Sequence, residues 1–143
     1  MDMRQLTPDY FVAPQLDPAD LADAAAAGIT TIICNRPDEE VPPSHQAEML
    51  AAAAENAGLA FHVLPLTHQT MTPDRVAMQT RIIDEAPGPV LAYCASGTRS
   101  AVAWTLGAAG KMGVDAVLDA AARGGYDLSA MRATLEAAAA HTR

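Results

Sequence analysis

The sequence predicts an α/β fold in which helices flank a mainly parallel central sheet. Apolar, β-branched runs alternate with helical segments along the chain, and this alternation is typical of parallel sheets. The order helix, glycine, strand also occurs twice, with Gly28 and Gly58 ending the helices. A chain of 143 residues buries one continuous core, so we expect a single domain over residues 1–143.

The elements of the first half follow from helix caps and apolar runs. Asp17 and Pro18 supply an N-cap and a first helical residue. The largely β-branched run over 29–34 has the character of a strand that is buried on both faces. The predicted elements are a strand over 10–13, a helix over 18–27, a strand over 29–34, a polar loop over 35–43, a helix over 44–57 and a strand over 59–64.

The second half contains one more helix and strand, followed by helices alone. Thr72 and Pro73 cap a helix, and a Pro-Gly-Pro turn introduces a strand that ends at Cys94. Glycines then separate three helical segments. The predicted elements are a helix over 72–85, a strand over 90–94, and helices over 99–112, 114–123 and 127–141.

Charge and composition exclude several classes of function. The net charge is −8, with 9 Lys and Arg against 17 Asp and Glu, so the clustered cations that bind nucleic acid or anionic membranes are lacking. No segment resembles a membrane span or a signal peptide, which predicts a cytoplasmic protein. Two cysteines, Cys34 and Cys94, cannot form a Cys-rich zinc site. We expect no nucleic-acid partner, no membrane partner, no metal and no cofactor.

The segment from Cys94 to Ser100 gives the strongest indication of chemistry. Cys94 ends a buried strand and Arg99 opens the next helix, where backbone N–H groups and the helix dipole stabilise a thiolate. The Arg99 guanidinium suits an oxyanion above the sulfur, and the Ser100 hydroxyl can tune the thiolate. A plain buried cysteine, the alternative, needs none of these neighbours. The small residues of the turn, which we expect to bind substrate, are Ala95, Ser96, Gly97 and Thr98.

Three segments together, over 35–40, 94–100 and 122–128, resemble the bacterial domain family named after beta-lactamase-hydrolase-like proteins. The resemblance covers nearly the whole chain, from Tyr10 to the last helix. That family is similar in fold to dual-specificity and protein tyrosine phosphatases. The resemblance therefore implies a phosphatase-like α/β fold and chemistry at Cys94.

The spacing within the turn separates two activities. Tyrosine and dual-specificity phosphatases have His before the cysteine and five residues between Cys and Arg, whereas this chain has Tyr93 and four residues. The Cys-x-x-Gly-x-Arg pattern is similar to that of single-domain rhodanese sulfurtransferases, whose cysteine carries a persulfide. A smaller ring of N–H groups suits a terminal sulfur and a wider ring suits a phosphoryl group. Alternatively, the shorter spacing merely reshapes the turn.

A phosphatase also needs a general acid, which similar enzymes take from the loop after the preceding strand. Here that loop, over 65–72, contains no carboxylate. His68 is a candidate, although a loop histidine is often simply solvated, and Asp74 sits where it stabilises a helix N-terminus. Sulfur transfer has less need of an acid because its leaving groups are already good anions.

Arg36 and Cys34 are further candidates at the same edge of the sheet. Arg36 either steers an anionic substrate or forms a salt bridge with a neighbouring acidic residue. Cys34 either acts as a resolving thiol for Cys94 or is a buried strand cysteine, and the second interpretation is favoured.

These observations predict a sulfurtransferase in which Cys94 takes sulfane sulfur as a persulfide and Arg99 binds the anionic part of the donor. The alternative is a phosphatase that forms a phosphocysteine at Cys94, with His68 or Asp74 as the acid. A second alternative is a non-catalytic anion-binding or persulfide-sensing module. The expected partners are a small-molecule sulfur donor and acceptor or a phosphorylated substrate, and the sequence predicts no oligomeric state.

Overall fold

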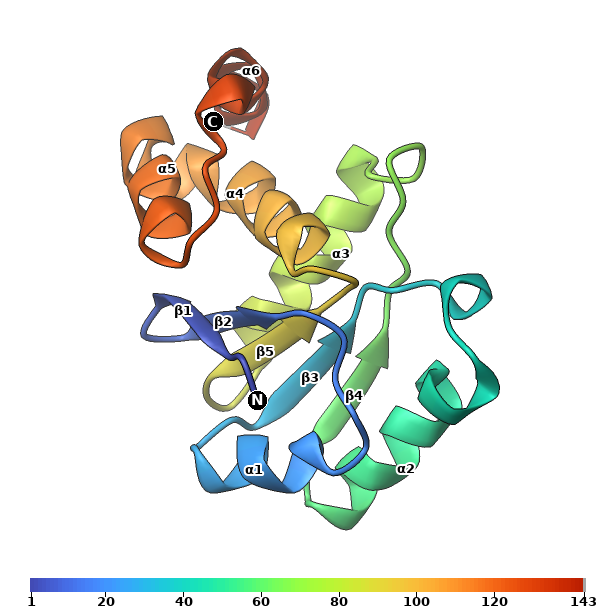
Figure 1. Cartoon of the computed structure of the whole chain (residues 1–143). Helices are drawn as coiled ribbons and strands as arrows, with labels where there is room; N and C mark the ends of the chain where they lie inside the picture. The colour runs from blue at the N-terminus through green and yellow to red at the C-terminus, as the bar shows by residue number, and fades with distance from the viewer. Residues whose placement is uncertain (143) are drawn as a thin grey trace.

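The structure, a computed structural model, describes residues 1–142 (Figure 1). Its strands are β1 (Arg4–Thr7), β2 (Tyr10–Ala13), β3 (Thr31–Cys34), β4 (Ala60–Val63) and β5 (Val90–Tyr93). Its α-helices are α1 (Asp20–Ala26), α2 (Ala47–Asn56), α3 (Pro73–Glu85), α4 (Thr98–Met112), α5 (Val114–Arg123) and α6 (Arg132–Thr142). Three 3₁₀ turns are η1 (Asp38–Glu40), η2 (Pro43–His45) and η3 (Ser129–Met131).

The strands form one sheet in the order β1-β2-β5-β3-β4. Four strands run parallel, and β1 pairs antiparallel with β2 at one edge. The central strand β5 is buried throughout, so the residues that follow it emerge at the middle of the carboxyl edge. The predicted α/β fold with a mainly parallel sheet is confirmed.

Two hydrophobic cores cover the two faces of the sheet. On one face, α1 and α2 contribute Leu21 and Leu50, which pack in one core with Ile32 of β3. On the other face, α3 to α6 pack over β2, β3 and β5, and Trp104 stacks on Tyr10 with ring centroids 5.9 Å apart. Figure 1 shows α1 and α2 below the sheet and the remaining helices above it. The strand periodicity of two sends alternate side chains into the two cores.

Two helices begin later than predicted, and side chains near their first residues make other contacts. α1 begins at Asp20 rather than at residue 18, since the Asp17 carboxylate contacts His45 at 2.7 Å and Asp20 Oδ2 accepts from Asp17 N at 2.8 Å. α2 begins at Ala47 rather than at residue 44, after η2, and Asp38 Oδ1 accepts from Ala47 N at 2.8 Å.

Two further differences lie near the ends of the chain. β1 is not predicted from the sequence, because Leu6 alone of its four residues is buried and no apolar alternation marks it. α6 begins at Arg132 rather than at residue 127, since Ser129 N and Oγ both bond Asp127 Oδ1 and a 3₁₀ turn follows.

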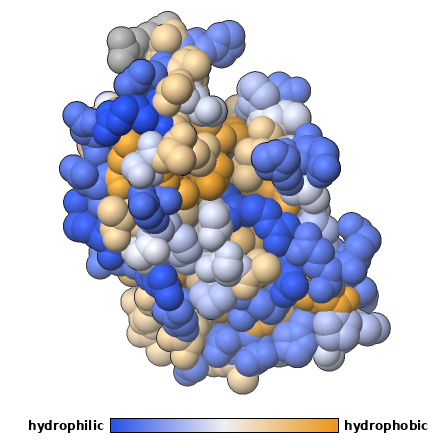
Figure 2. All heavy atoms as spheres, turned by 45° about the horizontal axis from the view of Figure 1, so that its top comes forward, coloured by the Kyte–Doolittle hydropathy of each residue, from blue (hydrophilic) through white to orange (hydrophobic). Residues whose placement is uncertain are grey.

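A hollow of about 920 Å³ lies between α3, α4 and α6. Small residues such as Gly107, Gly110 and Ala137 line it, and Figure 2 shows hydrophobic residues gathered at its base. No residue of the Cys94 turn lines it. None of the described helices is long and apolar enough to cross a membrane.

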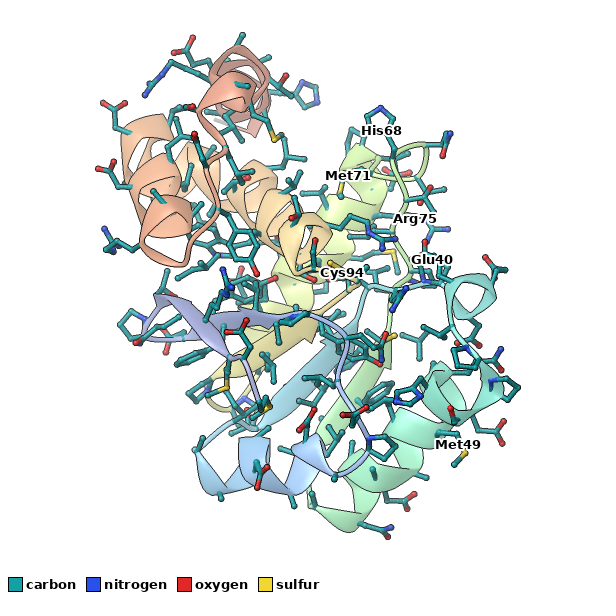
Figure 3. All side chains as sticks on the ribbon, in the orientation of Figure 1. Glu40, Met49, His68, Met71, Arg75 and Cys94 are labelled. Carbon is teal, nitrogen blue, oxygen red and sulfur yellow. The ribbon has the colours of Figure 1, made fainter. Side chains whose placement is uncertain are left out.

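Leu50 on α2 tests the packing of the lower core. Leu50→Ala is expected to lower the free energy of unfolding by about 2–5 kcal/mol, because it removes buried methyl groups and leaves a cavity. The control is Met49→Ala, since Met49 is 48% exposed on the same helix (Figure 3) and should change stability by less than about 0.5 kcal/mol. Urea denaturation followed by circular dichroism measures both, and equal losses would contradict the packing of α2.

Candidate active site

Cys94 lies at the carboxyl edge of the sheet, directly after β5, with its side chain fully buried (Figure 3). Gly97 N donates to Cys94 Sγ at 3.2 Å, so the turn curls over the sulfur. Ala95, Ser96 and Thr98 are exposed. The sulfur is therefore the floor of the turn and these residues form its rim.

Two contacts fix the carbonyl groups of the turn. Gln15 N donates to Ala95 O at 3.2 Å, and the Tyr126 hydroxyl donates to Ser96 O at 3.0 Å. In a trans peptide the N–H points opposite to the C=O. The Ser96 N–H, which follows Ala95 O, and the Gly97 N–H, which follows Ser96 O, therefore face the other side, where Gly97 N meets Cys94 Sγ. Within residues 1–142, no acceptor takes the N–H groups of Ala95 or Ser96. The Ser96 N–H, which faces the sulfur side, is therefore available to an anion there.

Gly97 is required for two reasons. Its φ is +94°, in the left-handed region that favours glycine. A Cβ at this position would also collide with the Tyr126 hydroxyl. The turn and Tyr126 thus fit only with a glycine between them.

Among the described residues, three of the five N–H groups of the Arg99 guanidinium donate to protein oxygens, and two remain. Nη1 donates to Glu40 Oε2 at 2.9 Å and to Leu66 O at 2.8 Å, and Nη2 donates to Glu40 Oε1 at 2.8 Å. The Nε–H and the second Nη2–H lie on the remaining edge. The hydrogen bond to Glu40 raises the pKa of Arg99 most, and the Cys94 sulfur raises it further, so this cation is close to the sulfur. The remaining edge suits bidentate contact with an oxyanion.

Glu40 is a carboxylate shared by two arginines. Besides its contact with Arg99, its Oε1 accepts from Arg36 Nε at 3.2 Å. Arg36 also donates to Gln15 Oε1 at 3.2 Å and to Glu40 O at 3.3 Å. The hydrogen bond from Arg99 is the main cause that lowers the pKa of Glu40, which keeps the carboxylate ionised at neutral pH. Arg36 thus forms the predicted salt bridge with a neighbouring acidic residue, and its role in steering an anionic substrate stays a prediction.

A buried polar network lies beneath the turn. Asn35 Nδ2 donates to Leu64 O at 2.9 Å and to Gln79 Oε1 at 2.7 Å. Gln79 Nε2 donates to the Tyr10 hydroxyl at 3.0 Å, which donates to Ser100 O at 2.8 Å. The network connects the end of β3 to β2, α3 and α4, and burial is the main cause that raises the pKa of Tyr10.

Ser100 belongs to the same network. Its side chain is buried, and its hydroxyl donates to Asn35 Oδ1 at 2.8 Å. A serine hydroxyl has one proton to donate. In this conformation that proton is directed to Asn35 rather than to the Cys94 sulfur, so Ser100 acts on the turn through its position at the start of α4.

Cys34 lies in the core between the sheet and the helices α1 and α2. Its thiol donates to Arg36 O at 3.4 Å, and burial raises its pKa. Both Cys34 and Cys94 are free thiols. The structure agrees with the favoured prediction of a buried strand cysteine.

The two candidate proton donors lie on the segment between β4 and α3. His68 is exposed, and Figure 3 shows it well apart from Cys94. Asp74 is exposed in the first turn of α3. The structure brings Arg99, Ser100 and the turn residues to Cys94 but places His68 elsewhere. Among the described residues, no three His, Cys, Asp or Glu side chains form a group that could hold a metal ion.

Sequence reasoning missed several residues that position the turn. Gln79 carries a signal, since it interrupts the apolar side of α3 three residues after Val76 and is itself buried. Asn35 directly follows a fully buried strand at the carboxyl edge. No pattern in the neighbouring sequence predicts that Glu40 contacts Arg99 or that Tyr126 contacts Ser96.

Comparison with known proteins identifies close relatives. A family model described as "Beta-lactamase hydrolase-like protein, phosphatase-like domain" matches residues 2–111. The beta-lactamase hydrolase-like protein of Agrobacterium fabrum is 34% identical over 122 residues, which cover 82% of this chain and 28% of that protein. The chain thus spans little more than a quarter of this relative.

Solved structures share the fold. A provisionally assigned phosphatase of Neisseria meningitidis is 35% identical, with a TM-score of 0.85 over 96% of this chain and 99% of that one. A Cys-to-Ser variant of P. aeruginosa TpbA, in complex with phosphotyrosine, is 16% identical, with a TM-score of 0.65 over 97% of this chain and 90% of that one. At that identity the likeness concerns the fold alone.

Gly97→Ala tests the fit between the turn and Tyr126. We expect a loss of about 2 kcal/mol or more in the free energy of unfolding, because backbone strain of about 1–2 kcal/mol adds to the collision. Combining it with Tyr126→Phe should recover part of the loss, since the hydroxyl is gone and the strain stays. Gly28→Ala is the control, because Gly28 has φ +97° and open space around it. Denaturation curves that show equal losses for Gly97→Ala and Gly28→Ala would refute the collision.

Proposed function

The chain belongs to the phosphatase-like domain family of the beta-lactamase hydrolase-like proteins, and we propose that it is a cysteine-dependent phosphatase acting through a phosphocysteine at Cys94. One arrangement carries the proposal: Gly97 N of the turn donates to the Cys94 sulfur, and the Arg99 guanidinium, held by Glu40, lies near enough for the sulfur to raise the pKa of Arg99. A fold neighbour that binds phosphotyrosine supports a phosphorylated substrate.

The proposed reaction has two steps. Cys94 Sγ attacks phosphorus, an S–P bond forms, and the bond from phosphorus to the leaving oxygen breaks. The N–H groups of Ala95 and Ser96 and the Arg99 edge bind the phosphoryl oxygens, where negative charge is held. Water then attacks phosphorus, which releases phosphate and restores the thiolate.

Sulfur transfer is the second candidate, and the spacing within the turn favours it. Four residues separate Cys94 from Arg99, which makes a smaller ring than that of tyrosine phosphatases. In this case Cys94 would carry a persulfide, and the same donors would hold the anionic part of the sulfur donor.

A paired assay separates the two candidates. The protein is given an aryl phosphate and, in parallel, thiosulfate with cyanide, and phosphate or thiocyanate is measured. We expect phosphate release that is lost in Cys94→Ser, because serine is a far weaker nucleophile at neutral pH. Thiocyanate formation that depends on Cys94, without phosphate release, would replace the phosphatase by the sulfurtransferase. Mass spectrometry distinguishes the phosphorylated cysteine from the persulfide.

Glu40→Gln tests whether Glu40 orients Arg99. The variant keeps the shape of the side chain but loses the charge that holds the guanidinium, so kcat on an aryl phosphate should fall about tenfold or more. KM should not rise, because removing a negative charge near the site favours an anionic substrate. Glu39→Gln makes the same charge change on an exposed neighbour, so KM should again not rise, but kcat should stay unchanged. A raised KM with unchanged kcat would contradict the orienting role.

A further inference from the structure

The backbone of the loop beside Cys94 is held by side chains from three other parts of the fold. Three successive carbonyl groups each accept a hydrogen bond, and both N–H groups of the same stretch are also bonded, Leu64 N donating to Cys34 O at 2.9 Å. The contacts are Asn35 Nδ2 to Leu64 O at 2.9 Å, Arg75 Nη1 to Pro65 O at 3.1 Å, Arg99 Nη1 to Leu66 O at 2.8 Å, and Leu66 N to Asn35 O at 2.8 Å. Because the donors lie at the end of β3, on α3 and on α4, this stretch is fixed relative to the sulfur.

The tip of the loop is closed by its own hydroxyl groups. Thr67 N donates to Thr70 Oγ1 at 2.8 Å, and Thr70 N donates to Thr67 O at 3.2 Å. The two threonine hydroxyls also contact each other at 3.1 Å. His68 lies between them at the exposed tip, pointing away from Cys94 (Figure 3). The contacts of Thr67 and Thr70 thus hold the backbone on both sides of His68 in this arrangement.

Two hydroxyl groups beside the turn already donate their protons to other groups of the protein. The Ser100 hydroxyl donates to Asn35, and the Tyr126 hydroxyl donates to Ser96 O. The carboxylate nearest to Arg99 is Glu40, which accepts hydrogen bonds from two arginines and carries no proton to give. The side chain that the loop presents next to Arg99, Leu66, is apolar and fully buried.

We propose that the Cys94 site transfers phosphoryl groups from leaving groups that depart as stable anions, such as the carboxylate of an acyl phosphate or an acidic phenolate. Phosphate esters of alcohols and of ordinary phenols are poor substrates, because no described side chain is placed to protonate their leaving oxygen. The inference rests on the proposed phosphatase function and restricts its substrates.

The steps balance without a proton donor in the first of them. The thiolate and R–O–PO₃²⁻ give Cys–S–PO₃²⁻ and RO⁻, with the electron pair of the broken P–O bond leaving on oxygen. Water then converts the phosphocysteine to the thiolate, HPO₄²⁻ and a proton that passes to solvent. A general acid normally accelerates such a reaction by about 10²–10⁴-fold. Substrates with poor leaving groups do not receive this acceleration at the Cys94 site.

The test is a series of substrates that differ in the leaving group. Acetyl phosphate has a carboxylate leaving group with a pKa close to the value of about 4 for side-chain carboxyls, and phenyl phosphate has a phenol with a pKa near the value of about 10 for tyrosine. Substituted aryl phosphates lie between them. We expect kcat/KM to fall by about 100-fold or more along the series, with the rate in Cys94→Ser subtracted at each point.

Two variants test whether His68 or Asp74 acts as a general acid. His68→Gln and Asp74→Asn should leave the dependence on the leaving group unchanged. A kcat/KM that stays within about threefold along the series, or a loss in either variant that is confined to phenyl phosphate, would overturn the inference while leaving the phosphatase intact. The absence of turnover that depends on Cys94 for every substrate would overturn the proposed function and this inference together.

Discussion

The side-chain amide of Asn35 is the contact on which the geometry of the site depends. Its nitrogen donates to Leu64 O and Gln79, and its oxygen accepts from Ser100, while its backbone N–H donates to Tyr93 O. Four elements therefore meet at one buried residue. A buried amide that loses a partner costs about 1–3 kcal/mol, so these elements are held in one arrangement. Because Ser100 and Tyr93 flank the turn over Cys94, that arrangement also fixes the position of the turn.

The division of the Arg99 donors decides what the site can bind. Glu40 takes one edge of the guanidinium and Leu66 O takes a further N–H, which leaves the Nε–H and the second Nη2–H for an oxyanion. The carboxylate also balances the charge of the arginine in the absence of substrate. In a chain of net charge −8, Arg36 and Arg99 share one carboxylate, so this group of three side chains carries one net positive charge beside the turn.

The residue before Cys94, Tyr93, faces the opposite side of the sheet, because side chains alternate along a strand. Tyr93 occupies the place where tyrosine phosphatases have histidine, but its ring lies in the core with α1 and α2. Within residues 1–142, its buried hydroxyl has no hydrogen-bond partner, and burial is the main cause that raises its pKa. Since alternate residues of a strand face opposite sides, Tyr93 points away from the turn and supports the lower core instead.

The sequence alone determined the four parallel strands, the order of the main elements along the chain and the turn of Cys94, Gly97 and Arg99. These features depend on neighbours in the chain, such as β-branched runs, glycines with positive φ and helix caps, so a local pattern reveals them. Only the tertiary structure decided that Glu40 orients Arg99 across 59 residues, and that Asn35 holds Ser100 across 65. It also decided that the histidine of the loop stands apart from the sulfur. Such contacts depend on which elements the packed sheet brings together, and no local pattern encodes that choice.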